Sequence, residues 1–212
     1  MTATNNRVQG KQMPLWPEAL MRALGLLPLP LLRALGRVIG WLLYVCVPQR
    51  RHVVLTNLRL CFPQQNAAWH QQTTREVFVY FAQAWLDRAW LWHGSQQLLK
   101  QRLQIDDPQQ LLKVRQNTVL FAPHFFGLDA GWTCLALQAH LSLCTIYTQQ
   151  SSPSADRWVR QGRQRLGHVQ QFRREDGVKK LISQLRQGHW LYLLPDMNFG
   201  TEESLFVPFY GV

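Results

Sequence analysis

Residues 118–148, TVLFAPHFFGLDAGWTCLALQAHLSLCTIYT, decide the fold of this chain. The run at 118–122 is short and apolar, which is typical of a buried strand. Residues 128–141 carry apolar side chains at helical spacing, and 141–148 form a second β-rich run. A strand, a helix and a strand with such short connections predict a parallel βαβ unit.

The alternation of helices and strands continues downstream. The sequence predicts a basic helix over 154–166, a strand over 168–172, a helix over 176–188 and a buried strand over 189–196. We therefore expect an α/β fold, with a mostly parallel or mixed sheet and flanking helices. In such folds the loops that follow the strands gather at one edge of the sheet, where ligands bind.

Two ionisable residues lie in the loop after the first strand, among apolar neighbours where an unpaired imidazole or carboxylate is costly. Pro123 and Gly127 disfavour one continuous helix, so we place His124 in the loop and Asp129 in the first helical turn. The chain can then fold the carboxylate onto one ring nitrogen of His124 and leave the other as a general base. An H-x4-D spacing also arises by chance, so its surroundings must support this interpretation. Asp196 ends the last predicted strand, at the same edge of the sheet.

The chain is basic, with a net charge of +11 over 212 residues. Residues 1–75 carry nine Arg or Lys against Glu18 alone, and residues 157–186 carry nine against two acids. Such charge favours anionic lipid surfaces, phosphorylated ligands, acidic proteins or nucleic acid. We expect the partner to be a membrane surface, because the basic residues of the N-terminus lie within an apolar segment. We expect no nucleic acid, because the aromatic residues follow the periodicity of a core.

The N-terminal segment is rich in Leu, Val and Trp between residues 15 and 47, but three arginines interrupt it. Its longest uncharged stretch, 38–49, is shorter than the roughly 20 residues of a spanning helix. We expect an interfacial or shallowly inserted helical anchor, with its basic flanks on the cytoplasmic side. The alternative is a helix pair docked on the core. We divide the chain into a basic N-terminus with an apolar anchor (1–48) and an α/β domain (49–212).

Beyond the anchor, residues 74–93 form an amphipathic helix with an aromatic stripe, which we expect to face the core. The stripe consists of Phe78, Phe81, Trp85, Ala89 and Trp92. The four cysteines have apolar neighbours and no metal-ligand spacing, so we expect buried free thiols and no bound metal. The sequence contains no G-x-S-x-G motif, so a serine hydrolase would lack its nucleophile elbow.

Six segments resemble, in order, the lipid A biosynthesis acyltransferases (lauroyl and myristoyl transferases) of the wider H-x4-D/E glycerolipid acyltransferase superfamily. They are NLRLCFP (57–63), APHFFGLD (122–129), GRQRLG (162–167), FRREDGVKKLISQLRQG (172–188), LPDMNFG (194–200) and LFVPFYGV (205–212). The resemblance implies transfer of a fatty acyl chain from an acyl carrier protein thioester to a hydroxyl of a lipid A precursor. It implies no covalent acyl-enzyme and no cofactor besides this donor, and it places the enzyme at the bacterial inner membrane, on the cytoplasmic face.

The resemblance also assigns roles to single residues. His124 would be the general base and Asp129 the residue that orients it. Arg163 would face phosphate or the transition-state oxyanion, and Asp196 would be a second polar support. The acceptor's acyl chains need an apolar channel, for which the candidates are Phe125, Phe126 and Trp132; ordinary core packing is the alternative for each.

The sequence departs from the family pattern in three places. Met197 and Asn198 replace the Gln-Asp of the family's PDQDFG, and Thr148 stands where the family's YRP carries its arginine. The family's sequences also continue past the position of Val212, so we expect an α/β domain that is incomplete at its C-terminus. The alternatives to a lipid A acyltransferase are a glycerolipid or lysophospholipid acyltransferase and an inactive, membrane-associated remnant.

Overall fold

The structure is a computed structural model that describes residues 15–113, 117–196 and 207–211. Its sheet has four strands in the described residues, in the order β1-β4-β2-β3, and all are parallel. The α/β fold is therefore confirmed. The substituted positions 197 and 198 lie outside the described residues. The strands are β1 (Val119–Phe121), β2 (Leu143–Tyr147), β3 (Val169–Arg173) and β4 (Trp190–Leu193).

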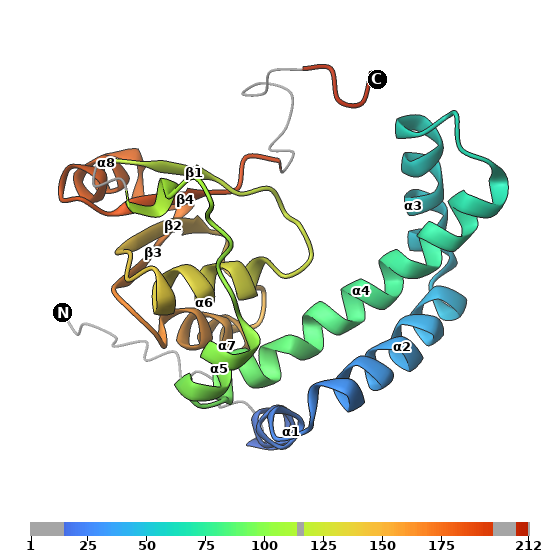
Figure 1. Cartoon of the computed structure of the whole chain (residues 1–212), viewed down its shortest axis with the longest axis horizontal. Coiled ribbons are helices and arrows are strands. Elements are labelled where there is room, and N and C mark those ends of the chain that lie inside the picture. The colour runs from blue at the N-terminus through green and yellow to red at the C-terminus, as the bar shows by residue number, and fades with distance from the viewer. Residues whose placement is uncertain (1–14, 114–116, 197–206, 212) are drawn as a thin grey trace, which may run out of the picture.

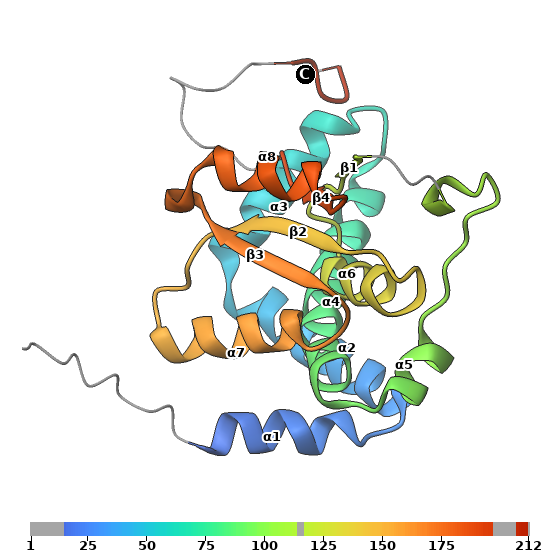
Figure 2. The same ribbon diagram turned by 90° about the vertical axis from the view of Figure 1, so that its left-hand side faces the viewer.

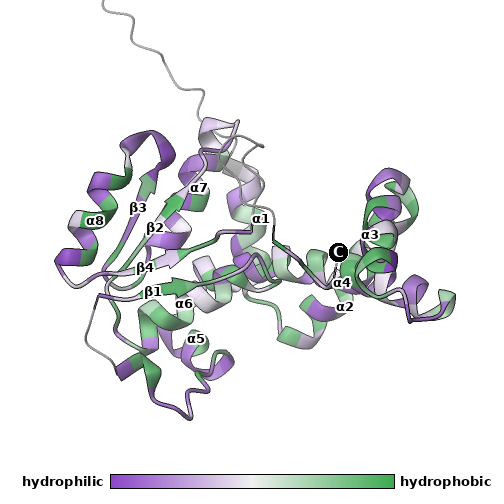
Figure 3. Cartoon of the chain, turned by 90° about the horizontal axis from the view of Figure 1, so that it is seen from above, coloured by the Kyte–Doolittle hydropathy of each residue, from purple (hydrophilic) through white to green (hydrophobic). Residues whose placement is uncertain are grey.

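Helices cover both faces of the sheet (Figure 2). On one face α6 (Leu128–Gln138) and α7 (Pro153–Gln164) lie between the sheet and the N-terminal helices, and α8 (Val178–Arg186) covers the other face. The alternation of side chains along the strands produces two cores. Trp132, Ala136, Leu143, Trp190 and Tyr192 pack on the α6 side, and Cys144, Leu181 and Leu191 pack on the α8 side. Figure 3 shows the apolar residues along β1 and β2.

An arm of helices projects from the α/β unit (Figure 1). Its longest member, α4 (Ala67–His93), begins at Asn66, whose side chain accepts a hydrogen bond from the backbone of Trp69. It runs from the outer end of the arm to the α/β unit, where it contacts α6 and α7 and is followed by α5 (Gln96–Arg102). The shorter helices are α1 (Leu15–Gly25), α2 (Leu29–Cys46) and α3 (Pro48–Cys61); the 3-10 turns are η1 (Leu111–Lys113) and η2 (Arg174–Asp176).

The aromatic stripe on α4 divides between core and surface. Phe78, Ala89 and Trp92 are buried as predicted, but Phe81 is 52% exposed and Trp85 is 45% exposed. The buried face of α4 follows a four-residue step instead, through His70, Thr74, Phe78, Ala82 and Leu86. The prediction of a core role was wrong for Phe81 and Trp85, because they lie to one side of the face that α4 presents to α2.

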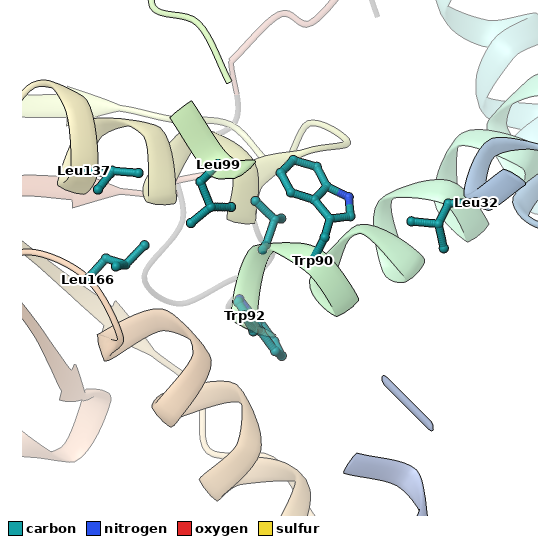
Figure 4. Packing of buried hydrophobic residues seen from close by; sticks show 7 residues of the cluster. Leu32, Trp90, Trp92, Leu99, Leu137 and Leu166 are labelled. Atoms are coloured by element: carbon teal, nitrogen blue, oxygen red, sulfur yellow. The ribbon is translucent and has the colours of Figure 1, made fainter. Parts of the chain in front are cut away.

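Close contact between α2 and α4 holds the arm together. Leu32, Gly36 and Gly40 are the buried residues of α2. A Cβ atom on Gly40 would lie 2.5 Å from the Cα of Val79, so glycine allows the two backbones to approach. Arg33 of α2 also donates to the buried carboxylate of Asp87 on α4. Figure 4 shows the apolar contacts continuing from Leu32 through Trp90 and Leu99 to Leu137.

The outer face of α2 stays exposed, and it includes Val38 (56%), Trp41 (60%) and Val45 (49%). Over its 18 residues α2 is long and apolar enough, by length and composition alone, to cross a membrane. The two expectations for the N-terminus therefore describe opposite faces of one helix: the inner face docks on α4, and the outer face exposes apolar side chains beside Arg37.

The cysteines are all free thiols, and burial differs among them. Cys134 and Cys144 are buried as predicted, and burial raises the pKa of Cys144 to about 11. Cys61 is partly buried. The prediction was wrong for Cys46, which is exposed because it ends α2 on the outer part of the arm.

Candidate functional site

A histidine and a carboxylate meet at the C-terminal edge of the sheet. His124 lies three residues after β1 and Asp196 three residues after β4, and these two strands are neighbours in the sheet. The imidazole Nδ1 lies 2.7 Å from Asp196 Oδ1, and the backbone N–H of His124 donates to Asp196 Oδ2 at 2.7 Å. Both oxygens of one carboxylate thus hold the same residue in place.

The loop that carries His124 is shaped by a tight turn before α6. The backbone N–H of Phe125 donates to the carbonyl of Pro123 at 2.7 Å, and Gly127 then adopts a left-handed conformation with φ 85°. Glycine takes this conformation without the steric cost that other residues meet. The chain can therefore turn sharply from the loop into α6, and His124 stays outside the helix, as the sequence predicts.

Asp129 does not contact His124, which corrects the predicted pair. Asp129 lies in the first turn of α6 and is buried, and its two oxygens accept hydrogen bonds from two arginines. Arg88 Nε of α4 lies 2.9 Å from Oδ2, and Arg163 Nε of α7 lies 2.7 Å from Oδ1. The physical reason is that a buried carboxylate is best compensated by full charges, and α4 and α7 bring two of them. Asp196, which was expected to be a second support, occupies the position predicted for Asp129.

The two carboxylates share a depressed pKa for different reasons. Burial by itself raises the pKa of Asp129, but the guanidinium groups of Arg163 and Arg88 outweigh it and bring the pKa below its ordinary value. For Asp196, burial acts in the same upward direction, and the hydrogen bonds from the backbone and imidazole of His124 outweigh it. Both side chains are therefore anionic at neutral pH.

Arg163 is placed close to the predicted site by its contact with Asp129, and its side chain is 21% exposed. Only Nε contacts Asp129, and the same holds for Arg88. Among the described residues the terminal Nη atoms of both guanidinium groups have no hydrogen-bond partner. With one carboxylate and two guanidinium groups, this cluster has a net charge of +1.

The three aromatic candidates for an acyl channel separate into two kinds. Trp132 is 4% exposed, donates from its indole to the carbonyl of Arg163 and packs edge-on against Tyr192 at 5.4 Å. Trp132 therefore belongs to the core, which is the alternative that the sequence left open for it. Phe125 and Phe126 are 74% and 50% exposed beside His124. Tyr80 of α4 lies 6.3 Å from Phe126, between ring centroids, so α4 extends this aromatic surface.

The arrangement supports proton transfer by His124. With Nδ1 held by an anionic carboxylate, the favoured tautomer donates from Nδ1 and leaves the lone pair on Nε2. Nε2 has no hydrogen-bond partner in the described part of the chain, and the side chain is 41% exposed. A hydroxyl group could therefore reach it from solvent. No group of three His, Cys, Asp or Glu side chains within the described ranges could hold a metal ion.

Sequence reasoning missed Arg88 and misassigned the partner of His124. A parallel sheet that places the first and last strands side by side brings His124 and Asp196 together, since each follows its strand by three residues. The sequence shows that each residue follows a strand by three positions, but it does not show which strands are neighbours in the sheet. Arg88 carries no motif, and only the crossing of α4 over α6 places it near Asp129.

Comparison with known proteins gives one consistent result. The family model for bacterial lipid A biosynthesis acyltransferases matches residues 16–212. The lipid A biosynthesis myristoyltransferase of Escherichia coli (strain K12) is 30% identical over 185 residues, which cover 86% of this chain and 55% of the relative. A lipid A biosynthesis acyltransferase of Haemophilus influenzae is 29% identical over 83% of this chain and 55% of its own. The lauroyltransferase of Escherichia coli is 22% identical over 88% of this chain. The chain spans about half the length of these curated relatives.

Proposed function

The chain belongs to the bacterial lipid A biosynthesis acyltransferase family, and we propose that it transfers a fatty acyl chain to a hydroxyl group of a lipid A precursor. The donor in this proposal is an acyl carrier protein thioester, and the enzyme is an O-acyltransferase. The observation that carries the proposal is the contact between His124 Nδ1 and Asp196 Oδ1 at 2.7 Å, on the edge of a parallel sheet where ligands bind.

In the proposed reaction His124 acts as the general base. Nε2 takes the proton of the acceptor hydroxyl while that oxygen attacks the carbonyl carbon of the thioester. The tetrahedral intermediate then collapses, the carbon–sulfur bond breaks, and the imidazolium returns its proton to the departing thiolate. Asp196 holds the imidazole in the required tautomer and stabilises its positive charge during the step.

Asp129 has a different role in this proposal from the one that the sequence suggested. It is a positioning residue that fixes Arg163, and with it Arg88, through the contacts at 2.7 Å and 2.9 Å. The terminal nitrogens of Arg163 would then donate to the oxyanion of the intermediate or to a phosphate of the acceptor. The net positive charge of the cluster suits either anion.

The exposed aromatic residues beside His124 would receive acyl chains. Phe125, Phe126 and Tyr80 offer apolar surface within the same neighbourhood as the base. Burial of such surface by a hydrocarbon chain contributes about 25 cal/mol per Å². We propose that this surface binds the acyl chains of donor and acceptor.

The proposed place of action is the cytoplasmic face of the bacterial inner membrane. The outer face of α2 exposes apolar side chains, and the chain's net charge of +11 suits an anionic lipid surface. An acidic carrier protein would be attracted by the same charge. The proposed partners are therefore an acyl carrier protein, a lipid A precursor and an anionic membrane surface.

The test is to incubate membranes that contain the full chain with acyl carrier protein thioesters and lipid A precursors, and to measure the mass of the acceptor. We expect a mass increase of one acyl group. His124→Ala should lower the rate about 10²–10⁴-fold, while the variant stays bound to membranes. Asp196→Asn should also lower the rate strongly, because the amide cannot stabilise an imidazolium.

The matched control is His168→Ala, because His168 is exposed and lies before β3, at the opposite edge of the sheet. It should keep the rate of the unaltered chain. Full turnover by His124→Ala would refute the proposed base. Transfer to lysophosphatidate instead of lipid A precursors would identify a glycerolipid acyltransferase, and a folded, membrane-bound chain with no transfer to either acceptor would identify an inactive remnant.

A further inference from the structure

Helix α3 leaves one of its faces uncovered at the outer end of the arm, beside α4 (Figure 1). No residue of α3 is buried. Its uncovered face contains Val53, Thr56 and Leu60, which recur at three- and four-residue steps and so share one side of the helix. Val53 is 49% exposed and Leu60 is 53% exposed. The reaction proposed above does not use this face.

Two arginines flank the uncovered face. With about 100° of rotation per residue, Arg50 lies to one side of it and Arg59 to the other. Both residues are exposed, and among the described residues neither has an ion-pair or hydrogen-bond partner. Residues 48–75 contain no Asp or Glu, and the next acid along the chain, Glu76, accepts a hydrogen bond from Gln72. The face therefore has positive charge around an apolar centre.

Aromatic residues extend this face at the C-terminal end of α3. Phe62, which follows the helix, packs against Trp69 at 5.4 Å and against Tyr210 at 4.9 Å, between ring centroids. Tyr210 in turn packs against Phe209, and both remain more than half exposed. Residues 207–211 thus meet the end of α3, although they are far from it in the sequence. The α3 surface consists of Arg50, Val53, Thr56, Arg59, Leu60 and Tyr210.

The composition of the α3 surface favours a protein partner over a lipid surface. A helix that binds a membrane needs a broad apolar face that enters the boundary between headgroups and acyl chains. The α3 surface has only two aliphatic side chains, and Thr56 lies between them. An apolar centre with Arg and Tyr around it is typical of protein–protein interfaces. The larger exposed apolar side chains of the arm, such as Trp41, lie on α2 instead.

Helix α4 connects the α3 surface to the site at the edge of the sheet. Trp69 packs against Phe62 at the end of α3, and Tyr80 packs against Phe126 in the loop of His124. At about 1.5 Å per residue, Trp69 and Tyr80 are about 16 Å apart along the helix axis. A protein bound to α3 could therefore reach His124 with a flexible arm of similar length. A carrier protein holds its acyl thioester on such an arm.

We propose that the α3 surface is the docking site of the acidic carrier protein that donates the acyl chain. Carboxylates of the carrier would pair with Arg50 and Arg59, and an apolar side chain of the carrier would cover Val53 and Leu60. Complementary charge of this kind speeds and orients association. The inference rests on the proposed function in one respect, because it takes the donor from that reaction. What it adds is the place where the donor binds.

The test measures binding without turnover. A fluorescent carrier protein, with its acyl chain attached through an amide in place of the thioester, is titrated with the full chain in maltoside micelles, and anisotropy reports binding. Arg50→Glu and Arg59→Glu should each weaken binding about tenfold or more, because a like charge then faces the carrier. The double variant Val53→Gln, Leu60→Gln should weaken it about fivefold or more. Binding should also weaken as salt rises from about 0.1 M to about 1 M, because the Debye length falls from about 10 Å to about 3 Å.

A matched control separates a docking site from general positive charge. Arg186→Glu reverses the same charge at an exposed position in the last turn of α8, and it should change the affinity less than about twofold. A glutamate at position 59 opposes the helix dipole in the last turn of α3. If circular dichroism shows that Arg59→Glu does not fold, Arg59→Gln takes its place, with an expected loss of about threefold.

Flotation tests the membrane as the other occupant of the α3 surface. The Arg50→Glu and Arg59→Glu variants should float with vesicles of phosphatidylglycerol and phosphatidylcholine as the unaltered chain does. Loss of flotation with unchanged affinity for the carrier would assign the surface to lipid and overturn the inference. Equal losses of carrier affinity in the Arg50, Arg59 and Arg186 variants, or no binding of the carrier, would also overturn it.

The docking site and the proposed function can fail separately. His124→Ala should bind the carrier normally, so binding that depends on Arg50 and Arg59 without transfer would refute only the proposed function. If transfer occurs, Arg50→Glu and Arg59→Glu should raise KM for the carrier about tenfold and leave kcat unchanged. Transfer with an unchanged KM in both variants would refute only the docking site.

Discussion

Replacement of Asp129 by asparagine separates the observed ion cluster from the catalytic pair that the spacing suggests. The side chain keeps its shape but loses the charge between Arg88 and Arg163. The carboxylate is 10% exposed and the two arginines are 24% and 21% exposed, so solvent screens the ion pairs weakly. Removal of one partner from a buried pair costs about 3–5 kcal/mol, and we expect about 3 kcal/mol here because the arginines keep some access to water.

The magnitude converts to a measurable shift in melting temperature. In a domain of this size each kcal/mol lowers the melting temperature by about 2–4 °C, so the Asp129→Asn variant should melt about 6–12 °C below the unaltered chain at pH 7. Circular dichroism in maltoside micelles measures this. The control is Asp196→Asn, whose carboxylate is 39% exposed; its stability should change by less than about 0.5 kcal/mol.

The stability difference between Asp129→Asn and the unaltered chain should also depend on pH, in a direction set by the pKa of Asp129. The folded pKa of Asp129 lies below its ordinary value of 3.8, so the carboxylate stabilises the fold above that value. This stabilisation is lost as the pH falls through the folded pKa. The difference between Asp129→Asn and the unaltered chain should therefore be largest near neutral pH and shrink below about pH 4. Equal melting temperatures at pH 7 would refute the account of Asp129 as the centre of the ion cluster.

Three further predictions concern other parts of the fold. Gly40→Leu should lower the free energy of unfolding by about 1–3 kcal/mol or more, because the new Cβ would lie 2.5 Å from Val79 Cα. Val38→Leu on the exposed face should leave it unchanged, and melting curves of the two variants make the comparison. Burial, followed by the charge of Asp129, raises the pKa of Tyr192 to about 12, so its neutral phenol stabilises the fold and this stabilisation should be lost between about pH 10 and 12. Melting curves against pH should show that Tyr192→Phe lacks this part of the loss. The double variant Trp41→Gln, Val45→Gln should float less with anionic vesicles but keep its melting temperature, because both side chains are exposed. Deletion of residues 1–48 should instead destabilise the fold, because α2 also covers α4. Unchanged flotation of the double variant would count against the anchor.

The sequence by itself determined the order and type of the elements in the α/β unit. Each predicted strand and helix from 118 to 196 lies within a few residues of its observed counterpart, because apolar periodicity and glycine positions act locally. The same local signals placed His124 in a loop and Asp129 in the first turn of α6. The resemblance of six short segments was enough to indicate the family.

The tertiary structure alone decided which of these residues meet. His124 and Asp129 are five positions apart in the chain, yet His124 is held by Asp196, 72 positions away, because β1 and β4 are neighbours in the sheet. Asp129 is held by Arg88 and Arg163, which come from α4 and α7. Strand order and helix crossing depend on how whole faces pack together, and no local spacing encodes them. Asp129 is a buried carboxylate, and packing supplies both of its charged partners from other elements, α4 and α7.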